Sequence, residues 1–297
     1  MNINACFAKL VNRIQPSEAE KLSAQQHLYT VKARLTATFN IRRTLHTGSY
    51  ARNSFIRGGS DVDLFAVISK KECSRGDSLV QSTTVLSNVR DELLKRYPTT
   101  SVSTDENAVV VSFSSGISID VVPAVFDSML GGQSSLAGQS PLYLIPDGDG
   151  WWMQTCPDRH NKYIRLADER STGKLKRVAQ LLKHWCNSRT VRVPISSFHI
   201  EMLLAAEGVC NGPKSYAVCV TEALQLLAER ECRGMQDPLR ISGVIPATKT
   251  EAKRESALIA VRNSREHAKA ACWFDYAGKT DEAWQQWNFA FNYTFPK

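Results

Sequence analysis

Three aspartates could perform chemistry in this sequence. Asp61 and Asp63 stand two residues apart at the start of an apolar run that continues to Ile68, and Asp120 interrupts a second apolar run, 117–122. Side chains alternate along a strand, so Asp61 and Asp63 should point to the same face. Mg²⁺ prefers oxygen ligands, and two such ions can clamp the attacking and leaving oxygens of an in-line displacement. We therefore expect these three carboxylates to bind two metal ions.

The same residues also have a simpler interpretation, in which Asp61 and Asp63 cap a turn and Asp120 pairs with a lysine. A carboxylate is costly to bury unless it is paired or bound to a metal, and three clustered carboxylates repel one another without a cation. Gly48-Ser49 precedes the acidic pair. Glycine allows the backbone to approach a phosphate closely, and Ser49 can donate hydrogen bonds to it. The combination favours a metal-dependent phosphate site.

The elements that must position these side chains are strands in the first half of the chain. Strands are predicted over 43–47 and 62–68, and hairpins join 108–113 to 117–122 and 142–145 to 151–154. A capping box at Ser17–Glu20 opens a long helix. Another helix is predicted over 77–97, with Leu79 on its apolar face.

From Pro157 onward the pattern is helical. One helix, capped by Ser171 or Thr172, carries an apolar stripe with Leu182 and Trp185, and the next runs from Phe198 to about Glu207. Further helices are predicted over 215–233 and 247–271. Aromatic residues near the end of the chain are expected to pack against the body: Trp273, Trp284, Trp287, Phe289 and Phe291.

Composition excludes several classes of protein. The 297 residues are 43% hydrophobic and 22% charged, as in an ordinary globular protein. No apolar run is long enough to cross a bilayer and no secretory signal is recognisable, so we expect a cytoplasmic protein that does not bind membranes. The eight cysteines form no C-x-x-C pair, so free buried thiols are expected. The net charge of +8 suits a polyanionic ligand, but it equally suits a simply basic protein.

Several motifs together resemble a known superfamily. Gly48-Ser49, the Asp61-x-Asp63 pair and a later third acid are similar to the polymerase β-like nucleotidyltransferases. The stretch 48–64, GSYARNSFIRGGSDVDL, more narrowly resembles the cGAS/DncV-like nucleotidyltransferases (CD-NTases), bacterial relatives of cyclic GMP–AMP synthase. Similar segments follow at 120–124, 143–160, 181–185 and 196–201. The matches span about 48–201, and the C-terminal third agrees only in its helical character.

The resemblance implies a bilobal α+β enzyme with a mixed-sheet catalytic lobe and a helical C-terminal lobe. We predict N-terminal bracing helices over 1–40, the catalytic lobe over 41–156 and the nucleotide-binding lobe over 157–297. Asp61, Asp63 and Asp120 would bind two Mg²⁺ ions, with Mn²⁺ as a possible substitute. Gly48 and Ser49 would meet the nucleotide phosphates.

In the helical lobe, the resemblance implies that Lys183 and Ser197 contact the triphosphate and that Phe198 stacks on the donor base. The residues alone leave these roles open. Lys183 lies at the edge of the Leu182 stripe, where it could reach out of the core or be a snorkelling surface lysine. Ser197 and Phe198 fall in the first turn of a helix, which favours phosphate, but the residue type alone favours a place for Phe198 in the core.

The activity implied by the resemblance is condensation of NTPs, with ATP foremost, into a cyclic di- or trinucleotide second messenger for anti-phage (CBASS) signalling. Pyrophosphate would be released, and a downstream effector would bind the product. Because the chain has no Cys/His zinc insertion, activation by double-stranded DNA is not expected. The alternatives are constitutive activity and control by a regulatory protein or a phage product. Two rival functions stay open: a template-independent transferase that modifies RNA, a protein or a small molecule, and a non-catalytic nucleotide- or RNA-binding module.

Overall fold

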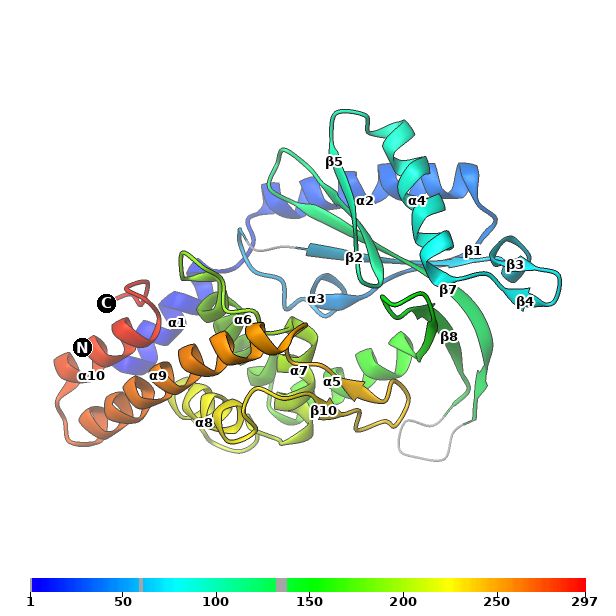
Figure 1. Cartoon of the computed structure of the whole chain (residues 1–297). Coiled ribbons are helices and arrows are strands. Elements are labelled where there is room, and N and C mark those ends of the chain that lie inside the picture. The colour runs from blue at the N-terminus through cyan, green and yellow to red at the C-terminus, as the bar shows by residue number, and fades with distance from the viewer. Residues whose placement is uncertain (1, 59–60, 132–137) are drawn as a thin grey trace. The chain divides into compact units, whose positions relative to one another are not determined.

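A mixed β-sheet forms the centre of the first half of the chain (Figure 1). The computed structural model describes residues 2–58, 61–131 and 138–297, without the side chain of Asp61. The strands are β1 (Ile41–His46), β2 (Asp61–Ile68), β5 (Ser101–Asp105), β6 (Ala108–Ser112), β7 (Ser118–Leu130), β8 (Ser140–Pro146) and β9 (Trp152–Thr155). They are ordered β1-β2-β7-β6-β5, and β8 pairs with β7 and β9. Strands β2 and β7 are parallel, whereas β1 and β6 run antiparallel to their neighbours.

Two helices cover one face of this sheet, α2 (Glu18–Thr38) and α4 (Ser82–Arg96) (Figure 1). The alternation of side chains along β2 explains this arrangement. One face of the strand belongs to the core that contains both helices, through Val62, Leu64, Ala66 and Ile68. On the other face, Phe65 and Val67 belong to a separate cluster with Tyr143 of β8. Asp63 has the same parity as Phe65 and Val67. It is therefore directed to the face opposite α2 and α4.

The chain divides into two compact units. The sheet unit comprises Pro16–Lys162 with Leu239–Ser242, and the helical unit comprises Met1–Gln15, Tyr163–Pro238 and Gly243–Lys297. The mixed sheet together with the helical unit confirms the predicted α+β class. The predicted boundaries after residues 40 and 156 stay predictions.

Helices form most of the helical unit. They are α1 (Ile3–Arg13), α5 (Pro157–Arg170, which begins in the sheet unit), α6 (Lys174–Asn187), α7 (Ser197–Ala206), α8 (Tyr216–Glu229), α9 (Glu251–Tyr276) and α10 (Thr280–Ala290), with a small hairpin of β10 (Met235–Gln236) and β11 (Val244–Ile245). The core of this unit includes Trp287 and Phe291, both fully buried and in edge contact with Phe7. All eight cysteines are free, and seven are buried, as predicted. No helix in the described ranges is both long and apolar enough to cross a membrane.

Some local predictions were wrong. The helix expected over 77–97 begins only at Ser82, because residues 74–79 form a small hairpin of β3 (Ser74–Arg75) and β4 (Ser78–Leu79). The left-handed φ of Gly76, +63°, lets the chain turn there, and Leu79 lies in β4 instead of on a helix. Near the chain's end, Trp273 and Phe289 are 59% and 39% exposed, so these two aromatic residues pack against the body less completely than expected.

The cap of α6 also differs from the prediction. Its N-cap residue is Gly173, with φ +79°, instead of Ser171 or Thr172. The Ser171 hydroxyl still accepts a hydrogen bond from the Leu175 N–H at 2.9 Å. The serine therefore satisfies one first-turn donor of the helix from two residues before the cap.

The predicted capping box of α2 is confirmed, and it leads to a stability prediction. The Ser17 hydroxyl accepts from the Glu20 N–H at 3.2 Å, and Glu20 accepts from the Ser17 N–H at 2.7 Å. Loss of an N-cap costs about 1 kcal/mol, so Ser17→Ala should lower the Tm by about 2–4 °C. Thermal unfolding measures this shift. Gln25→Ala, on the exposed side of the same helix, serves as the control and should leave the Tm unchanged; an equal loss in both variants would contradict the assignment.

Candidate active site

Two of the three predicted acids lie side by side on neighbouring strands. Asp63 of β2 is the register partner of Asp120 of β7, and the two strands are parallel. Register partners on adjacent strands lie about 5 Å apart and point to the same face. Both residues are half-buried. Asp61 is the first residue of β2 and the register partner of Ser118. The structure describes its backbone but not its side chain.

Gly48 packs directly on the Asp63 carboxylate. A Cβ atom added at Gly48 would lie 1.5 Å from Oδ2 of Asp63, so a side chain would fit there only if the carboxylate or the backbone moved. The φ of Gly48 is +61°, a region that L-residues other than glycine rarely adopt. In addition, the Thr47 N–H donates to the Asp63 carbonyl at 3.1 Å. The Gly-Ser segment and the acidic strand are therefore packed directly against each other.

Ser49 lies in the short helix α3 (Gly48–Ala51), where the sequence indicated only a turn. Its carbonyl accepts from the Ser54 N–H at 2.9 Å, which closes the loop after α3 on itself. Ser49 is half-buried and follows directly the glycine that contacts Asp63. A group bound at Asp63 would thus lie near the start of α3.

The surroundings of Asp120 suit a hard divalent cation. Its two strand neighbours, Ile119 and Val121, are 0% exposed, and its Oδ1 atom is shielded from solvent. A second carboxylate beside it, at Asp63, adds charge repulsion that a divalent cation would relieve. No cluster of three candidate metal ligands occurs among the side chains that the structure describes, and that set lacks Asp61. The described donors fit such an ion but do not complete its ligand set.

Lys183 lies at the contact between α6 and α7 instead of at an exposed edge of the α6 stripe. It is 6% exposed and forms an ion pair with Glu201, which is 1% exposed. The alternative of a snorkelling surface lysine is therefore wrong. The reason is the packing of α6 on α7, which buries both charged groups at the contact between the two helices.

Ser197 and Phe198 begin α7, and both are half-buried, so Phe198 is not a core residue. The preceding Ser196 is the N-cap, and its hydroxyl accepts from the His199 N–H at 3.4 Å. Glu201 was missed as a functional candidate. The signal was available: it is the one acid in SFHIEMLLAA, where its neighbours Ile200, Met202 and Leu203 are apolar and buried. An acid in such a run requires a buried partner.

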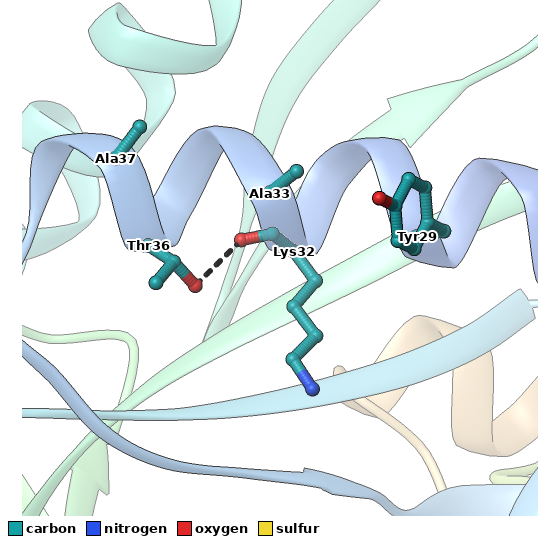
Figure 2. Close-up of a pocket in the computed structure, with 5 residues that line it drawn as sticks. All are labelled: Tyr29, Lys32, Ala33, Thr36 and Ala37. Atoms are coloured by element: carbon teal, nitrogen blue, oxygen red, sulfur yellow. Dashed lines mark hydrogen bonds between the residues drawn. The ribbon is translucent and has the colours of Figure 1, made fainter.

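A hollow of about 450 Å³ lies elsewhere in the sheet unit, on the outer surface of α2. Figure 2 shows its lining residues along this one helix: Tyr29, Lys32, Ala33, Thr36 and Ala37. The Thr36 hydroxyl donates to the Lys32 carbonyl at 2.9 Å. None of these side chains is a carboxylate, and α2 covers the face opposite Asp63. The hollow is thus separate from the acidic site.

Comparison with known proteins gives a match for most of the sheet unit. Residues 1–167 match the model of the SMODS family, the Second Messenger Oligonucleotide or Dinucleotide Synthetase domain. One curated relative, a cyclic AMP-AMP-AMP synthase of Escherichia coli strain MS 115-1, is 26% identical over 174 residues, which are 56% of this chain and 50% of that protein. The chain thus matches about half the length of this curated relative.

Solved structures resemble the whole fold. CdnC of E. coli MS115-1 with ATP has a TM-score of 0.71 at 19% identity and covers 99% of both chains; CdnC in its complex with HORMA-deltaN has a TM-score of 0.68 at 18% identity, with coverage of 99% and 96%. CdnE of Elizabethkingia meningoseptica, a cyclic dinucleotide synthase with GTP and Apcpp, has a TM-score of 0.62 at 19% identity and covers 91% of this chain and 98% of CdnE. At these identities the likeness concerns the fold, and it agrees with the α+β class expected from the motifs.

Proposed function

We propose that this chain, which belongs to the SMODS family of second messenger oligonucleotide or dinucleotide synthetases, condenses NTPs into a cyclic oligonucleotide. The family membership agrees with the resemblance to CD-NTases seen in the motifs. The observation that carries the proposal is the register pairing of Asp63 with Asp120, inside the matched residues 1–167 and with Gly48 packed on one of the two carboxylates.

The proposed metal site consists of Asp61, Asp63 and Asp120. Two Mg²⁺ ions, or Mn²⁺ in their place, would neutralise phosphate charge and stabilise the attacking and leaving oxygens when bound. Asp120 would accept the proton of a ribose hydroxyl. The hydroxyl oxygen would then bond to the α-phosphorus of an NTP, the bond from that phosphorus to the β-phosphate oxygen would break, and pyrophosphate would leave.

The remaining predicted residues would bind and orient the NTP. Ser49 would donate from its N–H and hydroxyl to the phosphates. Lys183 and Ser197 of the helical unit would contact the triphosphate, and Phe198, which is half-buried, would stack on the donor base. These groups hold the reacting atoms in line, which is the largest contribution that a protein makes to phosphoryl transfer.

The relatives support ATP as a substrate and a product of two or three nucleotides. One relative is a cyclic AMP-AMP-AMP synthase, CdnC was solved with ATP, and CdnE is a cyclic dinucleotide synthase solved with GTP. The complex of CdnC with HORMA-deltaN supports a regulatory protein as a partner. A role in anti-phage (CBASS) signalling, with an effector that binds the product, follows from the same proposal.

Mass spectrometry of the reaction products tests this function. The chain is incubated with all four NTPs and Mg²⁺ or Mn²⁺, and the mixture is treated with phosphatase. A cyclic product has no terminal phosphate, so we expect a phosphatase-resistant di- or trinucleotide that contains adenosine. If the regulatory partner is required, the same assay is run with it present. Transfer of a nucleotide to RNA, protein or a small molecule, without a resistant cyclic product, would instead support a template-independent transferase.

A further inference from the structure

The ion pair between Lys183 and Glu201 is deeply buried in the helical unit. Lys183 of α6 is 6% exposed and Glu201 of α7 is 1% exposed. For comparison, the pair Lys214–Glu222 in the same unit is 35% and 40% exposed. A buried ion pair contributes little to stability, because the desolvation of both charges offsets their attraction, and an apolar pair of similar volume often serves as well. Stability alone therefore does not account for these two charges.

The position of Glu201 on α7 indicates where the Lys183 ammonium lies. Glu201 lies four residues after Ser197, which is about 6 Å along the helix axis. Long side chains on a helix lean toward its N-terminus, so the Glu201 carboxylate lies over the turn that begins with Ser197 and Phe198. Through its bond to Glu201, the Lys183 ammonium is held close to this first turn of α7.

We propose that Glu201 is a positioning residue for Lys183: it fixes the ammonium beside the first turn of α7, in the place and the charged state needed to meet a triphosphate. The inference rests on the proposed function, because that function gives Lys183 a phosphate to bind. Lysine has a long, flexible side chain, and its charged form is disfavoured when it is buried without a counter-charge. Glu201 removes both difficulties, since it restrains the side chain and supplies the counter-charge.

The test compares three variants of the full chain for binding of a non-hydrolysable ATP analogue and for thermal stability. Glu201→Gln keeps the shape and removes the charge. We expect it to weaken analogue binding by about tenfold or more, the scale of a hydrogen bond to a charged group. Glu201→Asp keeps the charge but shortens the side chain, and should bind with an intermediate affinity. Glu222→Gln, which breaks the exposed pair with Lys214, is the matched control and should bind as the wild type does.

The charge swap Lys183→Glu with Glu201→Lys separates positioning from a structural role. The swap restores an ion pair but moves the ammonium from α6 to α7, so we expect a Tm close to that of the wild type together with weak analogue binding. If the swap restores binding as well as stability, or if Glu201→Gln binds normally, the inference is wrong. Should Glu201→Gln not fold, the swap alone decides.

The inference and the proposed function are tested independently, because the inference is tested by analogue binding and the function by formation of the cyclic product. A wild-type chain that binds the analogue but makes no cyclic product would contradict the function, while weak binding by Glu201→Gln would still support the positioning role. Conversely, a wild type that makes the product, together with a Glu201→Gln variant that binds normally, would overturn only the inference.

Discussion

Asp120→Asn should fold normally and lose NTP condensation. The amide has nearly the shape of the carboxylate, but it carries no negative charge for a divalent cation and accepts no proton from a ribose hydroxyl. Removal of one such group from a preorganised site costs on the order of 10³-fold in rate. Asp63→Asn should have an effect of the same order, since Asp63 is the register partner of Asp120. The initial rate of cyclic product formation measures both.

The Tm of Asp120→Asn distinguishes a metal-binding role of Asp120 from a purely structural role. If Asp120 served only to pair with a lysine, Asp120→Asn would lower the Tm and spare the activity. In a metal site, the substitution also removes repulsion between adjacent carboxylates, so the Tm should stay within about 3 °C of the wild-type value. Asp127→Asn is the matched control, because Asp127 is an exposed acid on the same strand, β7. It should leave both rate and Tm unchanged.

The sequence was sufficient to predict the sheet side of the site because its signals are local. Alternation along β2 assigns Asp63 to one face and Val62 to the other, whichever strand pairs with it. The capping box at Ser17 likewise depends on residues only three apart. What the sequence could not specify was the neighbour of each strand, and therefore the register that aligns Asp63 with Asp120.

The helical side was harder to predict because its signals depend on tertiary contacts. The helical period placed Lys183 at the edge of an apolar stripe, which on an isolated helix would be exposed. The packing of α7 on α6 buries that edge, and a partner eighteen residues away satisfies the charge. Only the lone acid in the apolar run of α7 hinted at this pairing. The contact of Gly48 with Asp63 is similarly tertiary, since nothing in the Gly-Ser pair specifies which atom the missing Cβ would meet.

Gly48→Ala should abolish product formation almost as completely as loss of an acid, although it removes no functional group. The added Cβ would lie 1.5 Å from Oδ2 and 2.4 Å from Cγ of Asp63, so the carboxylate or the backbone of α3 must move. A shift of about 1 Å in a catalytic group costs on the order of 10²-fold in rate. The rate of cyclic product formation and the Tm are measured on the same preparation.

The backbone strain of a left-handed alanine must be separated from the displacement of Asp63, and a substitution at Gly76 provides that comparison. Gly76 has nearly the same φ as Gly48, +63° against +61°, but a Cβ there would meet no atom within 4 Å. Gly76→Ala therefore adds only the cost of a left-handed alanine, roughly 1–2 kcal/mol, and should lower the Tm while leaving the rate unchanged. Gly48→Ala should lose rate far beyond what its Tm explains. Equal rates in the two variants would mean that Asp63 need not keep its place against α3, and the acid would then have no defined position from which to bind a metal ion.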